Sequence, residues 1–490
     1  MYIGIDLGTS SVKIVLMDEA HHVAATAEQP LQVSRPQPLW SEQDPHDWWR
    51  AVQSAINRLK HDYRNQLQQV RAIGLSGQMH GAVLINKQNQ PLRPAILWND
   101  GRSEAECRTL LQRAPEALAI TGNLIMPGFT APKLVWVSKH QPDIFSNVSK
   151  VLLPKDYLRL KITGTYATDM SDASGTAWLN VSERRWSPEM LAATGLNEQQ
   201  MPELFEGTEI TAPVLPNIAE DWGIPKDCVV VAGGGDNAAS AISMGVIETG
   251  QAFLSLGTSG VYFVADDQYR PNPQQTLHTF CHCLPQRWHQ MSVHLSAASC
   301  LDWIGKILGQ TDIPFLFELA QQHHPQTTPV FLPYLSGERT PHNDPYARGA
   351  LVGMTQATGA AELVQAVLEG VAFAFAQGQT VIEDSGVGID TVAVTGGGAR
   401  SAYWGEILAT VLQRPLIYRR QAAIGAAYGA ARLAWYSQHG GEFSAAFPTQ
   451  EIEHIISPIA SKYSKYQRKQ RLFESMYPQL KSSFKAFAEE

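Results

Sequence analysis

The chain has 490 residues, 44% of them hydrophobic, and carries a formal net charge of −8. That length is enough for about two large domains with sizeable cores. The acidic balance argues against a general role in binding nucleic acid or an anionic membrane surface, because both need basic patches. We therefore expect a small-molecule substrate as the main partner.

The composition also predicts a cytoplasmic protein. Five scattered cysteines form no paired framework, which is typical of a reducing compartment. The first residues lack the basic and apolar regions of a signal peptide. No segment has the run of about 18 uninterrupted apolar residues that a membrane span needs, so we expect no membrane partner.

Three short strands open the chain, predicted at 2–7, 12–17 and 23–27. An amphipathic helix follows at 45–60, with Asp44 as its N-cap. Its residues at helical spacing are Trp49, Val52, Ile56 and Leu59. A further strand is predicted at 71–76. A three-stranded meander that leads to a helix and another strand is typical of the ribonuclease H-like, actin-like fold.

The tetrapeptide Leu-Gly-Thr-Ser at 7–10 returns at 256–259, half a chain later. Each copy lies between apolar runs, and the second pair of strands is predicted at 252–256 and 261–265. Glycine lets the backbone approach an anion, and successive N–H groups with Thr and Ser hydroxyls can cradle phosphate oxygens. One copy alone would suit a plain hairpin turn, but two copies favour facing phosphate loops that hold one nucleotide.

The repeated motif and the repeated hairpin together predict a duplicated α/β fold. We expect two ribonuclease H-like domains of the actin-like/Hsp70-like ATPase superfamily, with a cleft between them. The first is placed at 1–246 and the second at 247–490, each with one phosphate loop. No Pro/Gly/Ser-rich linker lies near 245–250, so the hinge should lie within packed structure.

Two aspartates stand at predicted strand ends, where open α/β sheets bind ligands. Asp6 ends the first strand beside a phosphate loop, which suits Mg²⁺, an ion that takes few carboxylates and keeps several waters. Asp236 follows an apolar strand at 229–232 and three glycines. It suits a general base in phosphoryl transfer and equally the N-cap of a helix that begins at 237–238. The residues leave both interpretations open.

A third glycine-rich turn, at 396–400, follows a strand predicted at 391–395 and would bring its backbone close to an adenosine. The Walker pattern Gly-x-x-x-x-Gly-Lys-Ser/Thr is absent from the sequence, so the hairpin loops must hold the nucleotide. Three later helices are predicted, a buried one at 362–384, an Ala/Gly-rich one at 424–435 and a C-terminal one at 462–490. The last should pack its aromatic stripe onto the body of the protein.

Polar and aromatic residues gather after two strands of the first half, with Gln-Met-His-Gly at 78–81 and Trp-Asn-Asp-Gly-Arg at 98–102. These side chains suit hydrogen bonds to a polyol and contact with its apolar face. For His80 alone, a structural loop histidine is the ordinary interpretation.

Long segments resemble the two signatures of the FGGY family of carbohydrate kinases, at 128–140 for the first and at 349–354 and 362–369 for the second. The resemblance covers nearly the whole chain. Shorter motifs are similar to family members that act on D-xylulose, at 76–81, 98–102, 233–238 and 335–342.

The resemblance implies an enzyme that uses ATP and Mg²⁺ to phosphorylate O5 of D-xylulose, and a homodimer. It implies that Asp236 is the base acting on the C5 hydroxyl and that Asp6 organises the magnesium ion. The expected sugar contacts are Met79, His80 and Asn237, with Trp98 from the aromatic cluster. The expected nucleotide contacts are Thr9, Ser10, Gly257, Thr258 and Ser259 for the phosphates and Gly397, Gly398 and Arg400 for the adenosine.

Two other functions stay open. A kinase for another pentulose, such as D-ribulose or L-xylulose, would differ only in the configuration of the substrate hydroxyls. An actin-like or Hsp70-like ATPase would need no sugar. One departure from the family pattern concerns Ala426, where many relatives have proline, and Tyr428, which replaces a smaller apolar residue. This departure bears on nucleotide affinity more than on sugar choice.

Overall fold

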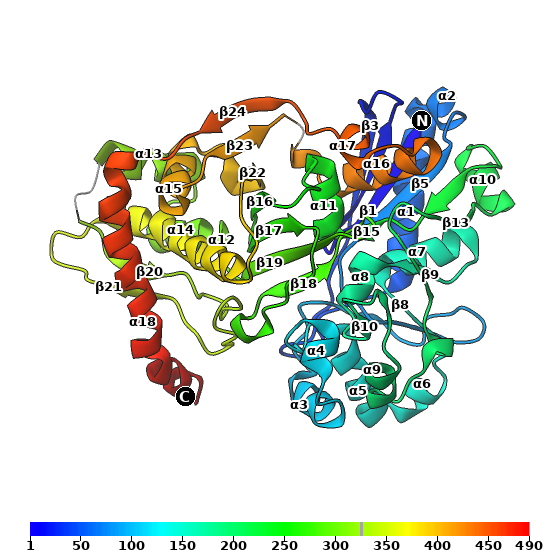
Figure 1. The fold of residues 1–490 in the computed structure, drawn as a ribbon, viewed down its shortest axis with the longest axis horizontal. Coiled ribbons are helices and arrows are strands. Elements are labelled where there is room, and N and C mark those ends of the chain that lie inside the picture. Colours follow the sequence, from blue (N-terminus) through cyan, green and yellow to red (C-terminus); the bar gives the residue numbers. More distant parts are fainter. Residues whose placement is uncertain (324–326, 421, 490) are drawn as a thin grey trace.

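The computed structural model describes residues 1–323, 327–420 and 422–489. Glu490, the last residue of the predicted second domain and C-terminal helix, lies outside the described residues, as do residues 324–326 and 421. The described helices and strands form two α/β lobes, each built around a seven-stranded sheet (Figure 1).

The first sheet has the strand order β13-β14-β5-β1-β2-β3, and β15 also pairs with β5. Its strands are β1 (Tyr2–Leu7), β2 (Ser11–Met17), β3 (Val23–Pro30), β5 (Ala72–Gly77), β13 (Ile210–Pro213), β14 (Val229–Val231) and β15 (Gly234–Gly235). The first three form an antiparallel meander, whereas β5 runs parallel to β1 and β14 runs parallel to β5. All residues of β5 are buried, as expected for a parallel strand covered on both faces.

The second sheet has the order β18-β19-β17-β16-β22-β23-β24. Its strands are β16 (Gln251–Leu256), β17 (Gly260–Asp266), β18 (His278–Cys281), β19 (Trp288–His294), β22 (Thr391–Thr395), β23 (Leu416–Arg419) and β24 (Ile452–Ile456). Strand β16 pairs antiparallel with β17 and parallel with β22, which repeats the way β1 pairs with β2 and β5. The predicted duplication of a ribonuclease H-like unit is confirmed.

Helix α1 (Pro45–Asp62) covers the first sheet against β2 and β3. Its start is set by Asp44, whose side chain accepts a hydrogen bond from the N–H of His46, with proline at the first helical position. The predicted helix and cap are confirmed, with one correction. Trp48 is fully buried and Trp49 is partly exposed, because the apolar stripe begins one residue earlier than expected.

Further elements complete the two lobes. The first lobe also contains β4 (Glu42–Gln43), α2 (Arg64–Leu67), β6 (Val83–Ile85), β7 (Ala95–Ile96), α3 (Glu104–Arg113), α4 (Ala117–Thr121), α5 (Thr130–His140), α6 (Pro142–Ser146), β8 (Lys150–Leu152), α7 (Pro154–Thr163), β9 (Ala167–Asp169), α8 (Met170–Ser174), β10 (Leu179–Asn180), β11 (Arg185–Trp186), α9 (Pro188–Ala193), β12 (Glu203–Phe205) and α10 (Pro216–Trp222). The second contains α12 (Ser299–Ile307), α13 (Ile313–His323), β20 (Val330–Leu332), β21 (Ala350–Val352), α15 (Ala402–Leu412) and α17 (Phe443–Ala446).

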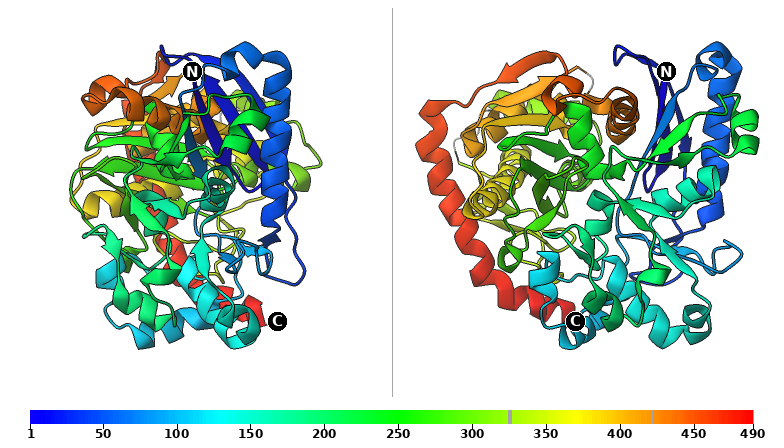
Figure 2. Two further views of the ribbon diagram at one scale, coloured as in Figure 1. Left: turned by 90° about the vertical axis from the view of Figure 1, so that its right-hand side faces the viewer. Right: turned by 45° about the vertical axis from the view of Figure 1, so that its right-hand side comes forward.

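Two central helices join the lobes. Helix α16 (Ala426–His439) comes late in the sequence, yet it packs on β1 and β5 of the first sheet and on α11 (Asp236–Met244). Figure 2 shows this orange-brown helix beside the blue strands of the first sheet. An added Cβ at Gly74 would lie 1.9 Å from the carbonyl oxygen of Ala430, and one at Gly429 would lie 1.8 Å from that of Ala239. Only glycine permits this close approach of the helices and strands. The division of the chain into two domains at 246/247 stays a prediction.

The family-pattern departure at Tyr428 lies at this junction. Its side chain is buried, and its hydroxyl donates to the carbonyl oxygen of His21 at 2.9 Å. Ala426 begins α16 and is also buried. Tyr428 therefore ties α16 to the turn between β2 and β3.

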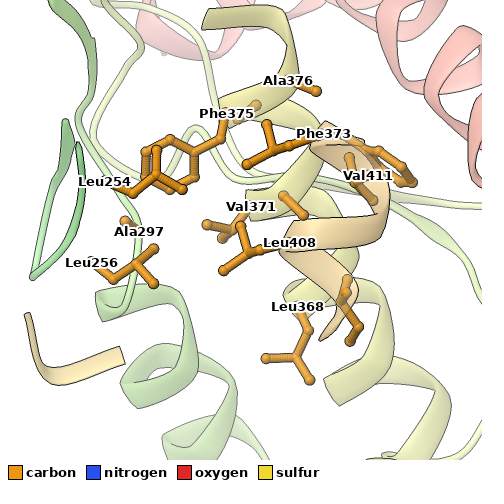
Figure 3. Close-up of a cluster of buried hydrophobic side chains, with 14 of the residues drawn as sticks. Leu254, Leu256, Ala297, Leu368, Val371, Phe373, Phe375, Ala376, Leu408 and Val411 are labelled. Carbon is orange, nitrogen blue, oxygen red and sulfur yellow. The ribbon is translucent and has the colours of Figure 1, made fainter. Parts of the chain in front are cut away.

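Helix α14 (Ala360–Asp384) forms the centre of the second lobe. Figure 3 shows side chains of α14, among them Leu368, Val371 and Phe375, gathered with Leu254 and Leu408 in one buried cluster. By length and composition α14 resembles a membrane-spanning helix, but 78% of its most apolar window is buried inside the fold. The predicted buried helix is thus confirmed as a core helix.

The C-terminal helix α18 (Tyr463–Glu489) lies along the outside of the second lobe (Figure 1). Its buried aromatic residues are Tyr466, Phe473, Tyr477 and Phe484. Phe487 is 64% exposed and does not belong to the packed stripe. The predicted packing is confirmed except at this last turn.

Candidate active site

Asp6 and Asp236 lie at the same edge of the first sheet. Asp6 pairs with Ser76 across β1 and β5, and Gly234 of β15 pairs with Ser76 from the other side. Asp236 follows β15 directly. The two carboxylates therefore flank the carboxyl end of β5, the edge at which open α/β sheets bind ligands.

Asp236 is the first residue of α11, and Gly235 occupies the N-cap position. The interpretation of Asp236 as an N-cap is therefore wrong. Its Oδ1 accepts hydrogen bonds from the backbone N–H of Asn237 at 2.7 Å and from Asn237 Nδ2 at 3.0 Å. Among the described residues, its Oδ2 accepts no hydrogen bond, so this oxygen is available to a ligand.

Both carboxyl groups hold protons more tightly than usual. Burial raises the pKa of Asp236 to about 7, the Asp6 carboxylate adds to the rise, and the Asn237 hydrogen bonds oppose it. Burial raises the pKa of Asp6 to about 6, and the nearby Ser76 hydroxyl and Lys13 ammonium offset part of this. A carboxylate with a pKa near 7 suits proton transfer at neutral pH.

The loop that carries Asp236 is held by groups that the sequence did not single out. Gly233 has φ of 79°, and a Cβ there would lie 1.8 Å from the carbonyl oxygen of Leu75, so only glycine fits. The N–H of Gly235 donates to Ser171 Oγ at 3.0 Å, and Ser171 Oγ donates to Asp169. No sequence pattern marked Ser171, because it follows Asp169 in an ordinary capping arrangement.

A fully buried ionic cluster lies beneath this loop. Lys155 Nζ lies 2.7, 2.8 and 3.1 Å from carboxylate oxygens of Asp156, Asp169 and Asp172. Arg159 donates to the carbonyl oxygen of Val231 at 2.7 Å and to that of Ala232. The cluster therefore ties the strand that precedes the glycine turn to the body of the first lobe.

His80 sits in a strained turn with its orientation fixed. Its φ is 68°, a left-handed conformation that costs energy for a residue other than glycine. Its Nδ1 lies 2.6 Å from the carbonyl oxygen of Gly175, which can only accept, so Nδ1 carries the proton and Nε2 is an acceptor. Burial lowers the pKa of His80 to about 3. The imidazole is thus neutral and offers one lone pair.

Lys133 holds the backbone of this turn. Its fully buried Nζ donates to the carbonyl oxygens of His80 and Gly128, both at 2.8 Å. Thr130 Oγ1 also donates to the His80 carbonyl, at 3.1 Å. Burial lowers the pKa of Lys133 to about 7. The sequence patterns gave Lys133 no role, although its place in the first FGGY-like signature was a usable signal.

Met79 forms part of the wall next to Asp236. It is 5% exposed, and a Cβ on Gly235 would lie 2.9 Å from its sulfur. His80 stacks on Phe129 with ring centroids 4.9 Å apart. The structure thus brings Met79, His80, Asp236 and Asn237 to one edge of the sheet together with Asp6.

Trp98 is joined to the first phosphate loop. Its Nε1 donates to Thr9 Oγ1 at 3.0 Å, and Thr9 Oγ1 lies 3.0 Å from Gln78 Oε1. Ser10 is exposed. The Thr9 hydroxyl, expected to contact phosphate, is therefore already paired within the protein, which leaves a phosphate contact at this residue to the backbone.

The second loop, Gly257 to Ser259, is anchored through its carbonyl groups. The carbonyl oxygen of Thr258 accepts from the N–H of Ala297 at 2.9 Å and from Ser299 Oγ at 2.8 Å. These contacts fix the loop against the start of α12.

A hollow of about 530 Å³ lies between α12, α13 and the short turn η3 (Gly397–Arg400). Its lining includes Leu301, Asp302, Ile313, Phe317, Gly397, Gly398 and Arg400. A Cβ on Gly398 would lie 2.6 Å from the Trp404 ring, whereas one on Gly397 would meet no atom within 4 Å. Apolar walls facing a glycine turn suit the flat ring of a nucleobase.

Comparison with known proteins decides the family. Residues 1–243 match the N-terminal domain of the FGGY family of carbohydrate kinases, and residues 252–438 match its C-terminal domain. The chain belongs to the FGGY family of carbohydrate kinases. The resemblance noted in the sequence is confirmed.

Among relatives of this FGGY protein, xylulose kinase of Escherichia coli (strain K12) is 52% identical over 482 residues, covering 98% of this chain and 99% of the relative. A crystal structure of a xyloylose kinase from Brucella ovis matches with a TM-score of 0.94 and 46% identity, covering 98% of this chain and 99% of that one. Xylulose kinase from Rhodospirillum rubrum matches with a TM-score of 0.91 and 28% identity, covering 99% of each chain. The predicted two-domain fold is confirmed by these neighbours.

Proposed function

We propose that this FGGY kinase transfers the γ-phosphoryl group of ATP to O5 of D-xylulose, giving D-xylulose 5-phosphate. The observation that carries the proposal is the placement of Asp236 beside the Met79–His80 turn, with a raised pKa and an Oδ2 that has no hydrogen-bond partner among the described residues. The 52% identity with xylulose kinase of Escherichia coli over 98% of the chain supports the choice of sugar.

In this proposal Asp236 acts as the general base. Its Oδ2 accepts the proton of the C5 hydroxyl while O5 forms a bond to the γ-phosphorus and the bond to the ADP oxygen breaks. His80 accepts a hydrogen bond from a sugar hydroxyl at Nε2, and Asn237 and Trp98 line the same side. Asp236 then releases its proton to water as the product leaves.

Asp6 fits a water-mediated magnesium site. Its buried Oδ1 has no hydrogen-bond partner among the described residues, and an oxygen of this kind suits a hydrated Mg²⁺. Within the described residues, no three His, Cys, Asp or Glu side chains gather around a common metal position. Bound through Asp6 and the phosphates, Mg²⁺ would supply charge stabilisation to the transferred phosphoryl group.

The nucleotide would span the two lobes. We assign the adenosine to the hollow beside Gly397, Gly398 and Arg400. The phosphates would lie between the two glycine-containing hairpins, with contacts at Thr9, Ser10, Gly257, Thr258 and Ser259. Backbone N–H groups would carry much of this contact, because the Thr9 hydroxyl is already paired.

We also infer a cytoplasmic enzyme that works as a homodimer and has no nucleic-acid or membrane partner. All five cysteines are free, which suits a reducing compartment. Sedimentation of the purified protein tests the dimer.

The decisive experiment is a coupled assay of ADP release with Mg-ATP and D-xylulose, D-ribulose, L-xylulose or glycerol at matched concentrations. We expect a strong preference for D-xylulose. The variant Asp236→Asn should lose a factor of about 10² to 10⁴ in kcat while it still binds the sugar, and Asp143→Asn, an exposed carboxylate on α6, should behave as wild type. Preference for another sugar would overturn the substrate, and ADP release without sugar would favour an ATPase.

A further inference from the structure

The motif at 335–342 has no part in the reaction as proposed above, although its side chains reach the sugar side. It lies between β20 and β21 in the second lobe. A Cβ built on Gly128 of the first lobe would lie 3.9 Å from Nη2 of Arg339 and 2.7 Å from the carbonyl oxygen of Trp98. Arg339 therefore extends from the second lobe to Gly128 of the first lobe.

Gly128 is linked to His80 through Lys133. The carbonyl oxygen of Gly128 accepts from Lys133, and the same ammonium group donates to the carbonyl of His80. Burial is the main cause of the lowered pKa of His80 and of His278. The positive charge of Arg339 adds to it, for His80 after the charge of Lys133 and for His278 directly after burial. The guanidinium thus lies within electrostatic reach of the groups expected to hold the sugar.

The guanidinium of Arg339 has no hydrogen-bond acceptor in the part of the chain that the structure describes. The backbone N–H of Arg339 donates to Glu338 Oε1 at 2.7 Å, and its carbonyl oxygen accepts from the N–H of Asn343 at 2.6 Å. Burial lowers the pKa of Arg339, and the Glu338 carboxylate opposes this. The Arg339 side chain is partly exposed, so its N–H donors are open to solvent and can be taken up by the oxygen atoms of a ligand.

The backbone of the motif is held firmly on the second sheet. The N–H of Thr340 donates to the carbonyl of Val293 at 3.1 Å, and Thr340 Oγ1 donates to the carbonyl of Thr276 at 3.0 Å. Glu338 and Asp344 exchange two backbone hydrogen bonds at 3.0 and 2.8 Å. Arg339 is therefore presented from a fixed support rather than from a loose loop.

The chemistry of the sugar shows what this guanidinium would meet. The furanose ring of a 2-ketopentose closes through O5, so a sugar with a free C5 hydroxyl must be open-chain and carry a carbonyl at C2. A guanidinium is a planar fork of N–H donors that matches two neighbouring oxygens. We propose that Arg339 donates hydrogen bonds to the C2 carbonyl oxygen and a neighbouring hydroxyl of the open-chain ketose, and so selects ketoses over the corresponding sugar alcohols. This inference rests on the proposed function.

The test compares D-xylulose with xylitol, which has the same carbon chain but a hydroxyl in place of the carbonyl. For Arg339→Gln, kcat/KM for D-xylulose should fall by about 10- to 100-fold, as expected for loss of hydrogen bonds from a charged donor. The kcat/KM for xylitol should change far less, so the ratio of kcat/KM for D-xylulose to kcat/KM for xylitol falls. The KM for ATP should stay as in wild type.

Arg339→Lys keeps the positive charge but loses the planar guanidinium. Its kcat/KM for D-xylulose should lie between those of wild type and Arg339→Gln. Arg348→Gln is the matched control, because Arg348 lies beyond the motif and donates to the carbonyl oxygens of Pro345 and Ala347 nearby. Thermal unfolding of each variant and calorimetric titration with D-xylulose alone separate folding from binding. Weaker sugar binding with an unchanged melting temperature is the expected result.

An unchanged ratio of kcat/KM for D-xylulose to kcat/KM for xylitol, whether both values fall equally or neither falls, would overturn the assignment of Arg339. An altered KM for ATP would overturn it as well. These outcomes differ from failure of the proposed function. If wild-type enzyme prefers another ketose, the substrate proposal fails, and the ratio for that ketose and its alcohol still decides the role of Arg339.

Discussion

The ammonium Nζ of Lys133 lies 2.8 Å from the carbonyl oxygen of His80. This contact joins α5 to a residue whose φ of 68° is unfavourable for a side chain with a Cβ. Because both the backbone and the imidazole of His80 are fixed by hydrogen bonds, the acceptor that we propose for a sugar hydroxyl is oriented before substrate arrives. Lys133 is thus a positioning residue for the proposed sugar pocket.

Lys133→Met should lower kcat/KM for D-xylulose by about 10- to 100-fold, since two buried carbonyl groups lose a charged donor. The loss should appear mainly in the KM for sugar, while the KM for ATP changes little. Lys139→Met, on the same helix but with a side chain 64% exposed, serves as the control. Equal changes in both KM values would show a general structural effect instead.

The raised pKa of Asp236 predicts opposite pH effects on activity and stability. In the proposed mechanism Asp236 acts as the carboxylate, so kcat/KM for the sugar should rise with pH and level off above about 7. The folded protein holds this proton more tightly than the unfolded chain, in which the aspartate has its ordinary pKa of 3.8. Stability should therefore decrease as pH rises from about 4 to about 7.

Asp236→Asn should remove this stability loss, so that the variant unfolds at a higher temperature than wild type at pH 8. Melting curves across pH 4 to 8 check this. A variant with the same pH dependence as wild type would contradict the raised pKa.

Ser171→Ala should reduce kcat without weakening ATP binding. The N–H of Gly235 would lose its acceptor, and the turn that aims Asp236 would lose a support. We expect a decrease of about tenfold, consistent with one lost buried hydrogen bond of about 1 to 2 kcal/mol. Steady-state kinetics with each substrate varied in turn measure it, with exposed Ser146→Ala as control.

Trp98→Phe keeps the aromatic ring and removes the N–H that donates to Thr9 Oγ1. If this hydrogen bond positions the first phosphate loop, kcat/KM for ATP should fall severalfold. In the Thr9→Val background the same change should have a smaller effect, because the bond is already absent. Additive losses in the double variant would mean that Trp98 acts independently of Thr9.

Gly429→Ala should destabilise the protein strongly. Its Cβ would lie 1.8 Å from the carbonyl oxygen of Ala239, so α16 would have to move away from α11. We expect a loss of about 1 to 3 kcal/mol or more from overpacking and a clearly lower melting temperature. Gly388→Ala, whose Cβ would meet no atom within 4 Å, should change it little.

Much of the first lobe was predictable because its signals are local. The cap at Asp44 and the short apolar strands follow from hydrogen-bonding capacity and from apolar runs within a few residues. The apolar face of α1 was misplaced by one residue at Trp49, since adjacent tryptophans do not reveal which one faces the sheet.

The sequence by itself determined the duplicated strand-turn-strand pattern and the two carboxylates at strand ends, because glycine turns and strand periodicity are local requirements. Only the tertiary structure decided that α16 covers the first sheet, that Thr9 pairs with Trp98, and that Arg339 reaches the wall beside Gly128. These contacts join residues far apart in the chain. They depend on how closely helices and sheets pack, which no short window of sequence contains.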